Sequence, residues 1–212
     1  MLIEAYKYAL GLVQGAQSAL RLGNTAGLVS VNAHGFYWEG VRQGNTWSLA
    51  TAAAGVTVAA ANVFSAANAQ PLVGIANPAG SGYNAVIIYG RHTWNSGTPA
   101  AGGLVWAASP ANGLVTAAGG NGAVNTLTQQ LGGSRVKTFV NGAMTGITGN
   151  AILSFSGGPS TGALAANSNQ AFIDEVNGII CVPPGSAGGL FAAAAGTSPI
   201  INASMFWEEV PV

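Results

Sequence analysis

The chain has 212 residues, of which only 6% are charged, and six basic residues balance six acidic ones to a formal net charge of +0. That balance excludes a basic surface for nucleic-acid phosphates. A 49% hydrophobic composition with five tryptophans excludes the class of disordered chains, which are poor in hydrophobic residues and rich in charge. Because a soluble monomer normally relies on a charged surface, we expect much of this surface to be covered by other protein subunits.

The long uncharged stretches do not predict a membrane-spanning helix. They consist of Ala, Gly, Asn, Ser and Thr, whereas a spanning helix needs about 18 or more strongly apolar residues in a row. The first residues, with Glu4 and Lys7 among aromatic side chains, do not fit a signal peptide, so we expect synthesis in the cytoplasm. The single cysteine, Cys181, lies between Ile180 and Val182, which predicts a buried strand thiol.

The first 22 residues differ from the rest of the chain. Apolar residues recur there at an approximate helical period, which allows an amphipathic helix, although Gly11 and Gly15 each weaken it by roughly 1 kcal/mol relative to alanine. An arm that docks on a neighbouring subunit is an equal alternative. We therefore predict an N-terminal arm or short helix at residues 1–22, followed by a single β-sandwich domain at residues 23–212. The candidate contact residues of the arm are Leu2, Ile3 and Tyr6.

Short β-prone runs separated by glycine- and proline-containing turns fill the chain after the arm. We predict strands at residues 28–31, 46–49, 55–58, 72–76, 84–92, 103–107, 136–140 and 150–155. The turn cluster at residues 77–82 predicts a tight reversal between its two flanking strands, and residues 109–134 are expected to form a surface loop. Roughly ten short strands without a fixed repeat predict an all-β, antiparallel sandwich or barrel.

Residues 171–212 give the clearest strand pattern. Asn177-Gly178 lies between two β-prone runs and is the strongest short hairpin signal, because both residues tolerate positive φ. Pro183-Pro184-Gly185 then ends the second run, since neither proline can donate to a strand ladder. A further break is expected at residues 197–199. The pattern therefore predicts a four-strand meander with short turns.

The residue types that carry catalysis are scarce. His34 and His92 are the two histidines, and no spacing places a nucleophile beside a base and an acid, nor is there a G-x-S-x-G motif. We therefore expect no enzyme, no catalytic residue and no cofactor. His34 near Trp38 and His92 near Trp94 allow a sugar-binding cleft through aromatic stacking, but packing in the core or at an interface is the favoured interpretation.

Two acidic doublets, Asp174-Glu175 and Glu208-Glu209, carry the carboxylates that suit a hard cation. Adjacent strand residues point to opposite faces, so only one residue of each doublet is available to a shared site. We expect no metal site. The favoured interpretation is that these acids flank turns, pair with Arg135 or Lys137, or face a partner.

The C-terminal stretch also contains motifs known from a protein family. They are Ile173-Asp174-Glu175-Val176-Asn177-Gly178-Ile179, then Val182-Pro183-Pro184-Gly185, and the closing Ser204-Met205-Phe206-Trp207-Glu208-Glu209-Val210-Pro211. Shorter matches lie at His34-Gly35 with Glu39 and Gly44-Asn45, at Asn77-Pro78 with Ser81-Gly82, and at Gly103-Leu104-Val105-Trp106. Together these residues resemble small jelly-roll virion proteins of tailed bacteriophages. The matches cover most of the chain after residue 22, but each is short and structural in kind.

The resemblance implies a jelly-roll-like sandwich and a structural role in the virion. With the low charge, it predicts a capsid decoration or cement protein on the capsid surface, as a homotrimer that contacts the major capsid protein or other virion proteins, with no nucleic acid or membrane as partner. The alternative is a tail-associated receptor- or carbohydrate-binding module on the same fold. Candidate structural and interface residues, besides those of the arm, are Asp174, Glu175, Asn177, Gly178, Pro183, Pro184, Gly185, Trp207, Glu208 and Glu209. Trp207 is expected to close the sheet or to face a neighbouring subunit.

Overall fold

The computed structural model describes residues 37–66, 68–98, 103–109, 122–144 and 171–212, together with the backbone of three further strands, β1 (Ala5–Tyr6), β2 (Gln17–Ser18) and β10 (Asn150–Phe155). The chain divides into two compact units, Met1–Trp38 and Glu39–Val212. In the first unit, β1 and β2 form a two-stranded antiparallel sheet. Leu2, Ile3, the side chain of Tyr6 and the strand expected at residues 28–31 lie outside the described residues. The boundary predicted after residue 22 stays a prediction.

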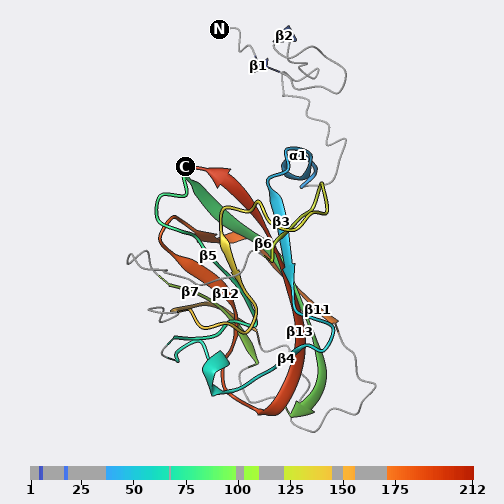
Figure 1. Cartoon of the computed structure of the whole chain (residues 1–212), viewed down its shortest axis with the longest axis vertical. Coiled ribbons are helices and arrows are strands. Elements are labelled where there is room, and N and C mark those ends of the chain that lie inside the picture. The colour runs from blue at the N-terminus through green and yellow to red at the C-terminus, as the bar shows by residue number, and fades with distance from the viewer. Residues whose placement is uncertain are drawn as a thin grey trace, which may run out of the picture. The chain divides into compact units, whose positions relative to one another are not determined.

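The second unit is an antiparallel β-sandwich, as predicted (Figure 1). Its six-stranded sheet has the order β11 (Ala171–Val182), β6 (Tyr83–Thr98), β13 (Thr197–Pro211), β3 (Thr46–Ala50) and β8 (Val124–Asn125), and β4 (Val56–Thr57) also pairs with β13. Its five-stranded sheet has the order β10, β7 (Leu104–Ser109), β12 (Ala187–Ala192), β5 (Val73–Ala76) and β9 (Lys137–Phe139). The described residues include two short helices, α1 (Trp38–Arg42) and the 3₁₀ helix η1 (Ala60–Asn62). Jelly-roll topology stays a prediction.

The main core lies between the two sheets, where alternate residues of both meet. Four of the five tryptophans, all but Trp38, are buried there. The ring of Trp106 from the five-stranded sheet packs directly on Gly90 of β6, where a Cβ atom would overlap it. Trp207 is fully buried, and it lies on β13 in the middle of the six-stranded sheet, so its side chain belongs to the core and does not close the sheet.

The five-stranded sheet is buried on both faces. Its outer face carries a second apolar cluster that includes Phe191 and Met144, and the segments at residues 59–71 and 139–144 contribute to it or border it. Asn62 of η1 ties these segments together: its Nδ2 donates to the carbonyl of Gln70 at 2.9 Å and to Oδ1 of Asn141 at 2.8 Å. β5 and β12 are therefore buried at every residue. The six-stranded sheet, by contrast, has buried and less buried residues in alternation, so the described residues leave most of its outer face uncovered.

Asn177 and Gly178 have the positive φ angles of a hairpin turn, 49° and 80°, but the chain does not reverse there. β11 pairs with β6 on both sides of the two residues, and the register shifts between Glu175 and Ile180. The predicted hairpin was therefore wrong. The pair forms a bulge within one continuous strand, because left-handed residues suit bulges as well as tight turns.

The predicted four-strand meander was also wrong. The stretch forms three strands, of which β12 belongs to the five-stranded sheet, and β6 lies between β11 and β13. Pro183-Pro184-Gly185 ends β11 as predicted, and Gly185, with φ of 85°, helps the chain cross from one sheet to the other. The break comes earlier than predicted: β12 ends at Ala192, and residues 197–199 already begin β13, with a shift of register before Ile200. β6 and β13, at 16 and 15 residues, are much longer than the short strands expected.

The turn cluster at residues 77–82 joins the two sheets, because β5 before it and β6 after it belong to different sheets. The predicted tight reversal between these two strands was therefore wrong. Asn77 is fully buried, and its Nδ2 donates to the carbonyls of Tyr83 at 2.7 Å and Val182 at 2.8 Å. The Gly185 N–H donates to the Asn77 carbonyl at 2.8 Å. The Asn-Pro and Pro-Pro-Gly turns, far apart in sequence, therefore form a single corner of the sandwich.

The Asn77→Ala variant is expected to lower the free energy of unfolding by about 2–3 kcal/mol, because two carbonyl groups lose a donor where Asn77 is buried. Urea denaturation followed by tryptophan fluorescence measures the change. Asn95→Ala is the matched control: Asn95, on β6, is only half-buried, and its side chain makes no hydrogen bond among the described residues. A loss for Asn77→Ala no larger than that of the control would contradict the corner.

Candidate functional site

The four C-terminal acids are separated as strand alternation predicts. Asp174 and Glu209 point into the sandwich and are buried, whereas Glu175 is exposed and Glu208 is half-buried. The two buried acids do not approach one another, since Asp174 lies opposite Gly90 of β6 and Glu209 opposite Ala85, about 16 Å apart along the strand. Within the described residues, no group of three or more His, Cys, Asp or Glu side chains gathers as a metal site would require.

Glu209 accepts the hydrogen bonds that hold together a corner near the start of β6. Its Oε1 accepts from the hydroxyl of Ser134 at 2.6 Å and from the backbone N–H of Arg135 at 3.0 Å, and its Oε2 lies 3.3 Å from Nη1 of Arg135. The Arg135 guanidinium stacks over the ring of Tyr83, 3.8 Å from its centroid. The predicted pairing of an acidic residue with Arg135 is present. It fastens the loop before β9 to β13.

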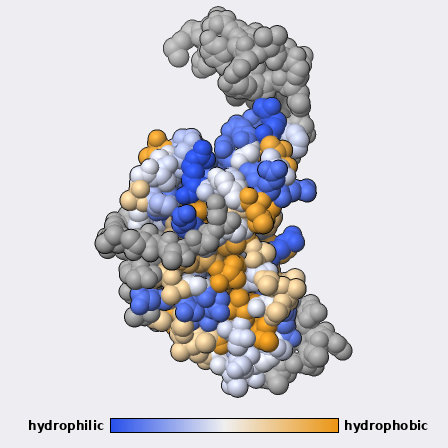
Figure 2. Space-filling view, in the orientation of Figure 1, coloured by the Kyte–Doolittle hydropathy of each residue, from blue (hydrophilic) through white to orange (hydrophobic). Residues whose placement is uncertain are grey.

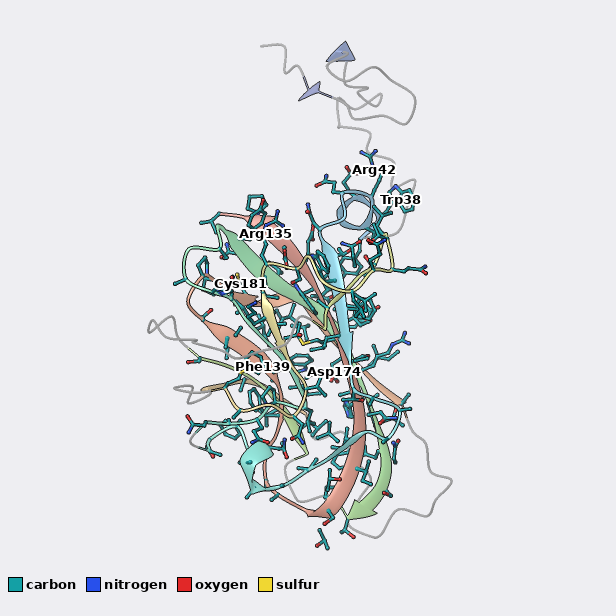
Figure 3. The ribbon with its side chains drawn as sticks, in the orientation of Figure 1. Trp38, Arg42, Arg135, Phe139, Asp174 and Cys181 are labelled. Atoms are coloured by element: carbon teal, nitrogen blue, oxygen red, sulfur yellow. The ribbon has the colours of Figure 1, made fainter. Side chains whose placement is uncertain are left out.

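Asp174 has a different partner, His92. Nδ1 of His92 on β6 lies 3.3 Å from Oδ2 of Asp174 on β11, at an angle that does not form a hydrogen bond, and the imidazole stacks on Phe172 at 5.1 Å between centroids. His92 is 1% exposed and Asp174 is 6% exposed. Figure 3 shows Asp174 well apart from Arg135, the partner of Glu209. The imidazole–carboxylate pair therefore joins β6 to β11 inside the sandwich.

The aromatic cleft considered for His92 and Trp94 was wrong, because both side chains are buried in the sandwich. His34 lies outside the described residues. Trp38, at the start of α1, is 42% exposed, and Tyr37 beside it is 38% exposed. Of the aromatic residues considered for ligand stacking, Trp38 therefore has an accessible ring.

The corner residues predicted as structural differ in exposure. Pro183 is exposed, Pro184 is half-buried and Gly185 is buried against Asn77. Asn177 is exposed at the bulge, and Gly178 packs so that a Cβ atom would lie 3.2 Å from Cγ1 of Val86.

Several apolar residues of the long strands lie on the outer face of the six-stranded sheet. We define the open face as Val86, Tyr89 and Arg91 of β6, Ile173, Glu175, Ile179 and Cys181 of β11, and Phe206 of β13. Ile173 and Ile179 are 58% and 66% exposed, and the rings of Tyr89 and Phe206 stack at 4.5 Å. Tyr89 and Phe206 were not among the predicted site residues, although period-two alternation along β6 and β13 is the pattern that places them on this face.

On the face drawn in Figure 2, hydrophilic residues form separate groups, with hydrophobic residues and residues of intermediate hydropathy between them. Of the open face, only Arg91 and Glu175 carry charge.

Cys181 belongs to the open face and is exposed, so the prediction of a buried thiol was wrong. That prediction relied on the apolar neighbours Ile180 and Val182. In a strand, however, two buried neighbours place the residue between them on the opposite face.

Partial burial raises the pKa of the Cys181 thiol above its ordinary value. Because the thiolate is the reacting form, alkylation by iodoacetamide at pH 8 is expected to be slower in dilute folded protein than in urea-unfolded chain. The rate should reach half its maximum at a higher pH than the value of about 8.5 typical of a free cysteine. Mass spectrometry of quenched samples from pH 7 to 10 gives the profile. A folded profile that coincides with the unfolded one would contradict the raised pKa.

Comparison of the chain with protein-family models, with curated proteins and with solved structures gives no match. Among the described residues, no helix has the length and apolar character needed to cross a bilayer.

Proposed function

We propose that the chain is a structural virion protein, a capsid decoration or cement subunit that stabilises a tailed-phage capsid through protein–protein contacts. It works as a homotrimer on the capsid surface and contacts the major capsid protein or other virion proteins. The observation that carries the proposal is the open face: a pleated surface with Ile173 and Ile179 exposed, on a chain with few charges. Contiguous exposed apolar surface of this kind marks interaction sites in folded proteins.

The low charge supports the same function. A subunit enclosed by neighbours must bring its surface out of water, and each unpaired charge taken with it costs free energy. Interface cores are correspondingly depleted in charged residues. Here the two buried carboxylates lie beside basic side chains, Glu209 beside Arg135 and Asp174 beside His92. The surface that remains suits close contact with other subunits.

Particle composition tests the proposal. Purified virions of the phage that encodes the chain are expected to contain it in many copies, and particles that lack it should release their DNA at a lower temperature or lower osmotic stress. Adding back the purified chain should restore the wild-type release temperature. A chain that is absent from purified particles, or whose loss leaves the release temperature unchanged, would defeat the proposal.

The exposed rings of Trp38 and Tyr37 favour a second candidate, a tail-associated receptor- or carbohydrate-binding module. Trp94 is buried and takes no part in this version. A glycan array with the wild-type chain and with Trp38→Ala separates the two functions. Binding that is lost in Trp38→Ala supports the module, and no binding by the wild-type chain removes it.

A further inference from the structure

The open face has three properties that specify a partner: shape, apolar content and charge. Strand pairing sets its layout, since Ile173 lies opposite Arg91, Glu175 opposite Tyr89, and Cys181 opposite Val86. Next to these, Phe206 of β13 stacks on Tyr89 at an interplanar angle of 18°. The described residues cover this sheet face near α1, where Gly40 lies against the carboxylate of Glu208, and at the loop of Gly55, which lies against the side chain of Asn202. The rest forms a broad pleated surface, and such surfaces pack well on other pleated sheets.

The two charges of the open face are opposite in sign and close together. Arg91 and Glu175 are diagonal neighbours on β6 and β11, because each is two positions away from the residue directly opposite the other. Neither takes part in an ion pair among the described residues. The Arg91 guanidinium instead lies 6.0 Å from the centroid of the Tyr89 ring. The face therefore offers one cation and one anion that form no ion pair within the described part of the chain.

This charge pair is self-complementary. Two copies can meet with their open faces in contact, related by a two-fold axis that lies in the contact plane. When this axis passes midway between Arg91 and Glu175, perpendicular to the line that joins them, each Arg91 lies over the Glu175 of the other copy. An isologous contact of this kind uses the same patch twice and closes on itself.

We propose that the open face binds the open face of a second copy of this chain, with Arg91 and Glu175 forming two reciprocal salt bridges across a two-fold axis. The proposal deepens the function given above and rests on it only for the biological setting. If the chain is a homotrimer, the three-fold contact uses other surfaces, and the open face joins one trimer to another. In either case, breaking the contact lowers the mass of the soluble assembly.

Charge reversal tests the contact. In Arg91→Glu, four carboxylates meet across the axis, and in Glu175→Arg, four guanidinium groups meet. Each variant alone is expected to associate at least about tenfold more weakly than the wild type, because like charges face each other at the contact.

An equimolar mixture of the two variants should regain association. The carboxylate introduced at position 91 of one chain then faces the guanidinium introduced at position 175 of the other, and the native Glu175 of the first faces the native Arg91 of the second. The double variant R91E/E175R should also associate, since each copy again carries one charge of each sign on its open face.

Sedimentation velocity from about 1 to 100 µM, a range spanning ordinary protein–protein affinities, gives the association constants. Circular dichroism checks that each variant is folded. Lys137→Glu is the matched control: Lys137 is an exposed cation on β9 of the other sheet, and its reversal should leave association unchanged. Wild-type protein that does not associate in this range would overturn the proposal, as would single variants that associate like the wild type or a mixture that does no better than its components.

The outcome separates this proposal from the proposed function. Wild-type chain that is abundant in particles but shows no contact through the open face leaves the virion role intact and removes the self-association. A chain that pairs through Arg91 and Glu175 but is absent from particles keeps the contact and removes the virion role. Alkylation of Cys181 gives an independent measurement, because pairing should slow it in the wild type and in the mixture but not in either variant alone.

Discussion

Glu209→Ala is expected to lower the free energy of unfolding by about 3 kcal/mol. Truncation removes the acceptor of the Ser134 hydroxyl and of the Arg135 N–H, at a carboxylate that is buried. The guanidinium of Arg135 also loses its counterion, but it is 43% exposed and solvent compensates most of that loss. The cost therefore comes from the loss of these two hydrogen bonds more than from the ion pair. Urea denaturation, with the m value checked for constancy, measures it.

Two variants make the Glu209 result specific. Glu209→Gln keeps an acceptor oxygen at the same place and removes only the charge, so it should lose less than half as much as Glu209→Ala. Glu208→Ala makes the same change in net charge one residue away, on the opposite face of β13, and should cost less than about 1 kcal/mol. Equal losses in the three variants would show that the corner around Ser134 and Arg135 does not stabilise the sandwich.

Gly189→Ala is expected to cost about 3 kcal/mol for a different reason, steric overlap in the five-stranded sheet. Gly189 of β12 is paired with Gly74 of β5, and a Cβ atom on Gly189 would lie 2.6 Å from the Val73 carbonyl oxygen and 2.7 Å from Cα of Gly74. These are backbone atoms of a strand that is buried on both faces, so neither has space to retreat. β12 must then separate from β5, and strand hydrogen bonds weaken.

Gly122→Ala is the matched control for this effect. A Cβ atom on Gly122 would meet its nearest neighbours, Oγ1 of Thr138 and Cδ1 of Leu49, at 3.5 and 3.7 Å, which is ordinary van der Waals contact. Its stability should stay within about 0.5 kcal/mol of the wild type. Thermal unfolding followed by circular dichroism compares the two variants. A Gly189→Ala protein as stable as Gly122→Ala would contradict the close approach of β12 and β5.

The positions of strands could be predicted from the sequence much better than their partners. Alternating apolar runs bounded by glycine and proline identify β3, β5, β7, β9 and β10 closely, because alternation is a local property of one strand. Pairing depends on distant residues. Asn177-Gly178 satisfies the φ requirements of a hairpin, and only the presence of β6 along both halves of β11 makes it a bulge.

The candidate site was predictable to a similar extent. Alternation correctly separated Asp174 from Glu175 and Glu208 from Glu209, yet the partner of Asp174 was not foreseen because His92 is more than eighty residues away. The open face was missed since Ile173, Tyr89 and Phe206 are on three separate strands. A surface becomes visible only when strand order and register are known together.

The place of β13 in the six-stranded sheet has a consequence for how the chain folds. This strand pairs with β6, β3 and β4, so it fills the middle of the sheet, but it follows all of them in the sequence. During synthesis, β6 and β3 leave the ribosome before β13, the strand that lies between them in the sheet. Their apolar side chains stay exposed until β13 has been made. Contacts that span most of a chain also slow folding. We therefore expect the domain to fold after synthesis of β13, late and in one cooperative step, with the preceding strands vulnerable to aggregation until then.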